Sequence, residues 1–129
     1  MDYYYSTLLN NITFEETIEK VTAELQKEGF GVLTEIDIKA TLKKKLDVDF
    51  YNYRILGACN APFAYKALKA EDKIGTMLPC NVIVQEKEPG IIEVSAINPI
   101  VSMQAVVNES LAPIALEIGD KLKRVLENL

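Results

Sequence analysis

Two cysteines, each followed by an asparagine, are the residues of this sequence whose types and spacing could do chemistry. Cys59 precedes Asn60, and Cys80 precedes Asn81. A thiolate is a nucleophile and a soft metal ligand, and two neighbouring thiols can exchange electrons through a disulfide. Cys59 also lies just before a predicted helix start, where unpaired backbone amides favour negative charge. The two Cys-Asn pairs are therefore the first candidates for a functional site.

These thiols allow three interpretations. A free cysteine often packs as a small hydrophobic residue without any chemistry, which is the simplest interpretation here. Alternatively, Cys59 could act as a nucleophile and Cys80 as the thiol that resolves the covalent intermediate. Both could instead hold a soft ion such as Cu(I) with Met77 or Met103, whereas zinc would need further ligands from carboxylates. We expect no resident metal and no cofactor.

The charge balance and the lack of histidine exclude several classes of function. Because the chain has no histidine, Ser-His-Asp and Cys-His catalysis are excluded within one chain. Lysine and arginine total 14 against 19 acidic residues, which gives a net charge of -5. This charge opposes binding to nucleic acid phosphates and to anionic lipid. We therefore expect neither nucleic acid nor a membrane as a partner.

Arg54 is a further candidate for ligand binding. It lies in a predicted strand, on the side opposite to Tyr51 and Tyr53. The simplest expectation is that its side chain faces solvent. The alternative is that its guanidinium binds a carboxylate or phosphate of a ligand, since the planar fork matches those groups.

Length and composition are those of one folded domain that covers residues 1–129. Hydrophobic residues make up 49% of the chain and charged residues 26%, which is typical of a globular protein. No window approaches the roughly 18 apolar residues of a spanning helix, and the first residues lack the basic start of a signal peptide. We therefore expect a cytoplasmic protein with reduced thiols.

Alternating and helical patterns predict about five strands and four helices. The predicted strands cover residues 2–9, 30–38, 51–59, 80–85 and 92–96. The first helix starts at a capping box formed by Thr13 and Glu16 and ends before Gly29. Two shorter helices are predicted over 39–46 and 61–70, the second with Asn60 as its N-cap. The last helix begins near residue 108 or 110 and has an apolar stripe that continues to residue 129.

The strand patterns also predict which way the thiols point. Cys59 shares its side of the strand with Tyr53 and Ile55, and Cys80 shares its side with Val82. Both thiols are therefore expected on the apolar face of the sheet. If these two strands are antiparallel neighbours, the end of one meets the start of the next, and the two sulfur atoms lie close together.

Two linked motifs carry a resemblance to a known family. The run from Leu56 to Leu68, LGACNAPFAYKAL, is followed by IGTMLPCNV from Ile74 to Val82. In this order they resemble the domain of unknown function 302 family, over nearly the whole chain. The family often has proline where this chain has Ala61, and the predicted helix start does not depend on that proline.

The resemblance implies a fold but no settled activity. The implied fold is a two-layer α+β domain, with a curved, mainly antiparallel sheet of about five strands and helices packed on one face. Such a fold is similar to that of the TATA-binding protein, with a β-α-β-β-β-β-α core and short extra helices. This similarity carries no promise of DNA binding, which the acidic charge also opposes.

Our leading functional hypothesis is a small-ligand or partner-binding module with its site near the two Cys-Asn turns. A long apolar helix laid over a curved sheet commonly leaves a cleft with few polar groups. The candidate ligand-binding residues are Cys59, Asn60, Cys80, Asn81 and Arg54. One alternative is a thiol-based redox or transfer enzyme, with both asparagines as hydrogen-bond donors. Another is a self-associating structural protein, in which the three tyrosines of residues 3–5 could contribute to a homodimer contact or to the core.

Overall fold

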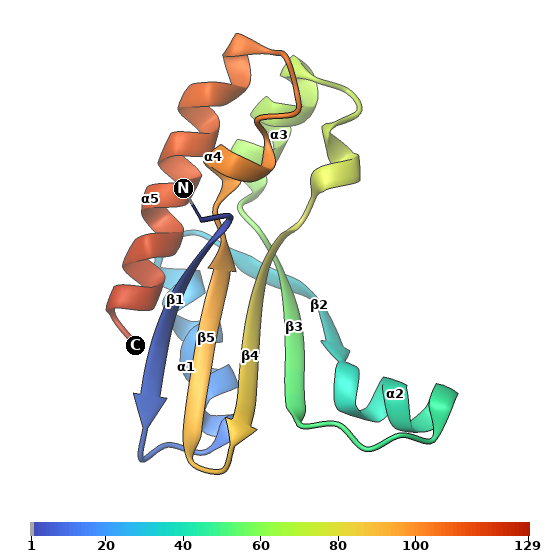
Figure 1. Cartoon of the computed structure of the whole chain (residues 1–129). Helices are drawn as coiled ribbons and strands as arrows, with labels where there is room; N and C mark the ends of the chain where they lie inside the picture. Colours follow the sequence, from blue (N-terminus) through green and yellow to red (C-terminus); the bar gives the residue numbers. More distant parts are fainter. Residues whose placement is uncertain (1) are drawn as a thin grey trace.

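The computed structural model describes residues 2–129 and has two layers, a five-stranded antiparallel sheet and a layer of helices (Figure 1). The sheet order is β1-β5-β4-β3-β2. The strands are β1 (Tyr4–Asn10), β2 (Gly31–Asp37), β3 (Asn52–Cys59), β4 (Cys80–Glu88) and β5 (Ile91–Ile97). The predicted two-layer α+β fold is confirmed, and each predicted strand exists within a few residues of its predicted ends.

Helices cover one face of this sheet, and the other face carries no helix in Figure 1. The helices are α1 (Phe14–Lys27), α2 (Ile38–Leu46), α3 (Ala61–Ala70), α4 (Pro99–Ser102) and α5 (Ala112–Glu127). α1 and α5 lie across the covered face, whereas α2 extends beyond the sheet edge and buries none of its residues. No helix within residues 2–129 has both the length and the apolar character needed to cross a membrane.

Local sequence signals set the ends of α1. The Thr13 hydroxyl accepts a hydrogen bond from the Glu16 backbone amide, at 3.1 Å, which is one half of the predicted capping box. Within residues 2–129 the reciprocal hydrogen bond, from the Thr13 amide to the Glu16 side chain, is not formed. At the other end, Gly29 has a φ of +86°, a left-handed conformation that glycine adopts without steric cost. The buried stripe of Ile18, Val21 and Leu25 then faces the sheet.

The core lies between α1, α5 and alternate residues of the central strands. Its fully buried members from β3 to β5 are Leu56, Ala58, Val82, Val84, Ile92 and Val94. α5 contributes Ile118, Leu122 and Val125. Near the start of the chain, Tyr3, Tyr4 and Leu8 are 65%, 41% and 62% exposed. Tyr5, in contrast, packs against the core. The homodimer contact proposed for these tyrosines stays a prediction.

The prediction for the buried side of β3 was wrong. Leu56 and Ala58 are the buried residues, so the side shared by Tyr53 and Ile55 is the open face of the sheet. The side with Leu56 and Ala58 also carries Asn52 and Arg54 in the sequence, so alternation favoured the more apolar side of Tyr53 and Ile55, which is the open one. Cys59 belongs to the open-face series by position, although its side chain reaches a cavity at the strand end.

Arg54 does not face solvent, because the same reversal places it on the covered side. Its side chain is only 16% exposed. The guanidinium donates to Glu35 at 2.6 Å and to Glu15 at 2.9 Å, and Asp37 lies 3.7 Å away. It also lies 5.5 Å from the centre of the Phe14 ring. Arg54 therefore joins β3, β2 and α1, and its own chain supplies the carboxylates that a ligand would have offered.

Short helical segments before and after the long strands were not predicted. These are α4 and two 3-10 turns, Ile74–Met77 and Glu109–Leu111. Asn98 caps α4 by accepting a hydrogen bond from the Ile100 amide at 3.1 Å. The last helix starts at Ala112, slightly later than predicted, because the 3-10 turn occupies the preceding residues.

Replacing Arg54 tests whether this ion cluster stabilises the fold. Arg54→Met keeps the apolar stem but leaves Glu15 and Glu35 without their donor, so we expect a loss of about 1 to 3 kcal/mol in the free energy of unfolding. Arg124→Met is the matched control, because Arg124 is the chain's other arginine and is 49% exposed where it contacts Glu28. It should cost less than about 1 kcal/mol. Urea denaturation measures both, and equal losses would show that Arg54 has no special role.

Candidate functional site

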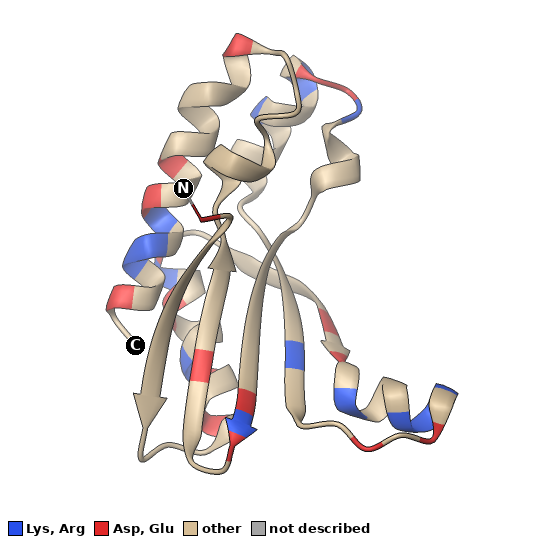
Figure 2. Ribbon diagram, viewed as in Figure 1, with Lys and Arg blue, Asp and Glu red and all other residues tan. Residues whose placement is uncertain are grey.

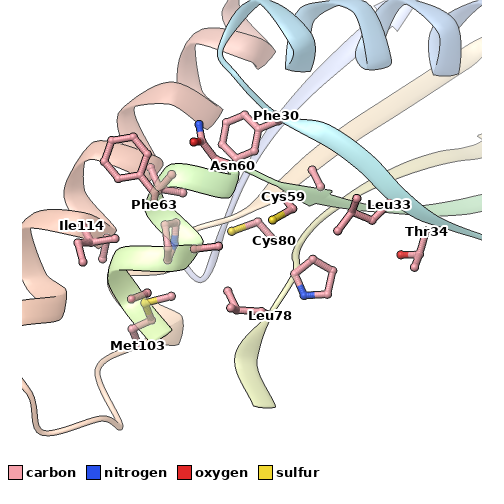
Figure 3. Close-up of a pocket in the computed structure, with 17 residues that line it drawn as sticks. Phe30, Leu33, Thr34, Cys59, Asn60, Phe63, Leu78, Cys80, Met103 and Ile114 are labelled. Carbon is pink, nitrogen blue, oxygen red and sulfur yellow. The ribbon is translucent and has the colours of Figure 1, made fainter. Parts of the chain in front are cut away.

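The two cysteines lie at the same end of neighbouring strands. β3 and β4 are antiparallel, and Ala58 is directly opposite Cys80 in their register. Cys59 is the last residue of β3, and the chain turns at Asn60 into α3. Figure 3 shows the two sulfur atoms side by side. The predicted proximity of the thiols is therefore confirmed, although Cys59 reaches this position through the strand end and not through the covered face.

Both thiols line one cavity of about 270 Å³ between the sheet end and the helices. Its walls come from β2, β3, β4, α3 and α5, and from the segment around α4 (Figure 3). The lining side chains are mostly apolar. They include Phe30, Leu33, Phe63, Leu78, Pro79, Pro99, Met103, Ile114 and Ile118. We call this space the thiol cavity.

Small residues leave the space that forms the thiol cavity. Ala64 and Ala67 on α3 and Ala115 on α5 all line it. Ala67 is buried, whereas the next residue of α3, Leu68, is 43% exposed. In the sequence, the spacing of Ala64 and Ala67 by about one helical turn indicates that α3 has a face of small residues.

Asn60 is the buried polar residue of the thiol cavity. It is 7% exposed, and its Nδ2 donates to the backbone oxygen of Glu28 at 3.1 Å. It is the N-cap residue of α3, as predicted, but its side chain makes no capping hydrogen bond. The amide is used instead to bind the end of α1. Among residues 2–129 no hydrogen bond is made to Asn60 Oδ1, which leaves an acceptor free.

The space beside Asn60 requires glycine at position 29. A Cβ atom at Gly29 would lie 3.1 Å from Asn60 Nδ2, closer than an ordinary contact. Gly29 therefore serves both the left-handed end of α1 and the approach of Asn60.

Asn81 and Arg54 do not join this cavity. Asn81 is exposed and lies on the open face of the sheet, in a groove with Tyr3, Tyr4 and Tyr53. Arg54 is held by the ion cluster described above. Of the five candidate residues, Cys59, Asn60 and Cys80 are thus brought together, and the two Cys-Asn motifs have different environments.

Electrostatics around the thiols favour neutral groups. Burial raises the pKa of the Cys80 thiol from 9.0 to about 11, and the neighbouring Cys59 adds to the rise. Cys80 is therefore protonated at neutral pH. No acidic or basic side chain is among the described residues that line the thiol cavity, so nothing there compensates a buried charge.

The alternative in which the two thiols hold a soft ion is not tested by the structure. Met103 lines the cavity with both cysteines, whereas Met77 does not. Within residues 2–129, histidine, cysteine and carboxylate side chains form no group of three that could hold a metal ion. Any metal would therefore depend on the two sulfurs of Cys59 and Cys80 with a weak thioether.

The raised pKa of Cys80 predicts a specific loss of stability at alkaline pH. Above pH 9 the unfolded chain ionises this thiol while the folded chain resists ionisation up to about pH 11. The free energy of unfolding should fall across that window by roughly 2 to 3 kcal/mol more in the wild type than in Cys80→Ala. The comparison is needed because burial also raises the pKa of Tyr5 and Tyr53. Urea denaturation at several pH values measures it, and parallel pH profiles for the two proteins would refute the burial of this thiol.

Comparison with known proteins confirms the resemblance. No curated protein matches the chain. The crystal structure of an uncharacterised conserved DUF302 protein from Bacillus stearothermophilus is similar, with a TM-score of 0.89, 28% sequence identity and coverage of 98% of each chain. The family described as domain of unknown function DUF302 matches residues 5–129, and the chain therefore belongs to this family.

Proposed function

We propose that the thiol cavity binds a small, uncharged and mostly apolar molecule that donates one hydrogen bond to Asn60 Oδ1. The observation that carries this proposal is a largely buried asparagine in the wall of a mostly apolar cavity, whose Oδ1 accepts no hydrogen bond from residues 2–129. Ligand sites of this kind combine apolar walls with few polar groups that fix orientation.

The size of the cavity limits the ligand. About 270 Å³ is near the lower end of the range for small-molecule sites, which starts at roughly 300 Å³. Flat bicyclic molecules are suitable probes at this size. Larger cofactors would require the surrounding helices to move.

Charge limits the ligand further. The described lining has no cationic or anionic side chain, so a charged molecule would lose its hydration without gaining a partner. The hydrogen-bonding direction is also set. Because Asn60 Nδ2 is used by Glu28, the free Oδ1 accepts and selects a ligand with an N–H or O–H donor.

Indole and indene test the role of Asn60. They have nearly the same shape, but only indole carries an N–H donor. We expect indole to bind about 3- to 10-fold more tightly, in line with one net hydrogen bond. The chain has no tryptophan, so indole emission can be followed directly, and indene can be measured by competition.

Two asparagine variants provide the matched control for this test. Asn60→Ala should remove the preference for indole, whereas Asn81→Ala changes the same motif on the open face and should leave the preference unchanged. Thermal unfolding checks that Asn60→Ala still folds. Equal affinities of indole and indene for the wild-type protein would refute the role of Asn60, and an effect of Asn81→Ala alone would place binding on the open face.

Filling the cavity should abolish binding without loss of the fold. Ala64→Leu adds a larger side chain from α3 into the cavity and keeps a residue with high helix propensity. We expect at least a tenfold loss of indole affinity. Ala61→Leu is the control, because Ala61 lies on the same helix but is exposed and does not line the cavity. If both variants bind indole like the wild type, the ligand does not occupy the thiol cavity.

A further inference from the structure

The geometry points to a second activity of the same cavity: Cys59 and Cys80 act as a dithiol that reduces small, uncharged disulfides. The inference rests on the proposed function only for the entry of a small neutral molecule. The chemistry itself depends on the placement of the two thiols.

The strand register brings the two cysteines within reach of a disulfide bond. Cys80 is directly opposite Ala58, and Cys59 is one residue further along β3. The spacing between paired strands and the rise along a strand then give a Cα separation of about 6 Å. Disulfides span roughly 4.4 to 6.8 Å between Cα atoms, and the two side chains must also face each other. The register alone would point Cys59 and Cys80 to opposite sides of the sheet, so the bond depends on the strand end, where the Cys59 side chain lines the same cavity as Cys80. Both thiols are free and partly buried, and both line the cavity into which Figure 3 shows them projecting together.

The environments of the two thiols assign them different roles. Cys80 is protonated at neutral pH because burial raises its pKa, which makes it a poor first nucleophile. Cys59 is therefore the attacking thiol, and Cys80 resolves the mixed disulfide. In the resolving step the two thiols belong to one molecule, and their proximity offsets the small fraction of Cys80 thiolate.

The exchange is balanced in two steps. The Cys59 thiolate attacks one sulfur of the substrate R–S–S–R, forms a Cys59–S–S–R bond and expels one R–S⁻, which takes up a proton from water. Cys80 then loses its proton to water, and its thiolate attacks Cys59 Sγ and expels the second R–S⁻, which also takes up a proton from water. The substrate gains two electrons and two protons, and the protein retains a Cys59–Cys80 disulfide. An external dithiol can reduce that bond and restore the pair.

The cavity selects the substrate by charge. Its walls are apolar, and the described lining carries no ionised group. An anionic disulfide would have to lose hydration without a counter-ion, whereas a neutral one would not. We therefore expect small neutral disulfides to react and dianionic disulfides of similar size to react slowly.

Two chromogenic disulfides test the proposal on the full chain. The neutral reagent is 4,4'-dithiodipyridine, and the dianionic reagent is 6,6'-dithiodinicotinate, which adds only one carboxylate to each pyridine ring. With one equivalent of the neutral reagent, the reduced protein should release two equivalents of chromophore, the second at a rate independent of reagent concentration. Intact mass and peptide mapping should then show a Cys59–Cys80 disulfide without bound reagent. Relative to a free cysteine peptide, the neutral reagent should be favoured by at least tenfold.

Single variants assign the two roles. Cys80→Ala should keep the rate of the first step but release only one equivalent and accumulate a mixed disulfide on Cys59. Cys59→Ala should react slowly, because only the buried thiol remains. Stable mixed disulfides on both cysteines of the wild type would overturn the proposal, and so would equal first-step rates in the two variants.

The outcome is distinguishable from failure of the proposed function. If indole does not bind but the wild type releases two equivalents and forms the disulfide, the dithiol activity stands and the indole-type ligand is wrong. If indole binds through Asn60 but neither thiol reacts with the neutral reagent, the cavity is a binding site only and the cysteines are packing residues.

Discussion

The antiparallel pairing of β3 with β4 is the constraint on which the cavity and its chemistry depend. This register places Ala58 opposite Cys80 and Gly57 opposite Asn81, so that both Cys-Asn motifs meet at one end of the sheet. Gly57 makes the arrangement possible, because a Cβ atom there would collide with Thr34 of β2 and with Pro79. β2, β3 and the segment before β4 therefore come together at position 57, where only glycine fits.

Local sequence signals predicted the positions of helices and strands well, but they predicted poorly which side of a strand the helices cover. The Thr13 hydroxyl and Gly29 set the ends of α1 through contacts within a few residues, and both were read correctly. The covered side of β3 depends on which layer packs against it, and that information is not local. Because Tyr53 and Leu56 lie on opposite sides and are both apolar, only the packing of α1 and α5 decides between them.

Identical dipeptides acquired different roles for the same reason. Asn60 and Asn81 both follow a cysteine, yet Asn60 is buried by the backbone of Glu28 from the end of α1 and Asn81 lies on the open face. Sequence reasoning could find the thiols because their chemistry is a property of the residue type. The two asparagines could not be distinguished in this way. The partner of Asn60 is the backbone oxygen of Glu28, which is distant in the sequence and is not marked by any residue type.

The distribution of charge explains how an acidic chain can hold a neutral site. In Figure 2 charged residues lie mainly on α1, α2 and α5 and at the β4–β5 turn, while α4 and the Ile74–Met77 turn carry none. One end of the sheet is joined to α1 by the ion cluster of Arg54, and the other end surrounds two thiols with apolar side chains. The charges that stabilise the fold are thus separated from the cavity. A neutral Cys80 thiol is stable there, and the proposed disulfide exchange therefore relies on the proximity of the two thiols to each other and to a neutral substrate instead of on a neighbouring base.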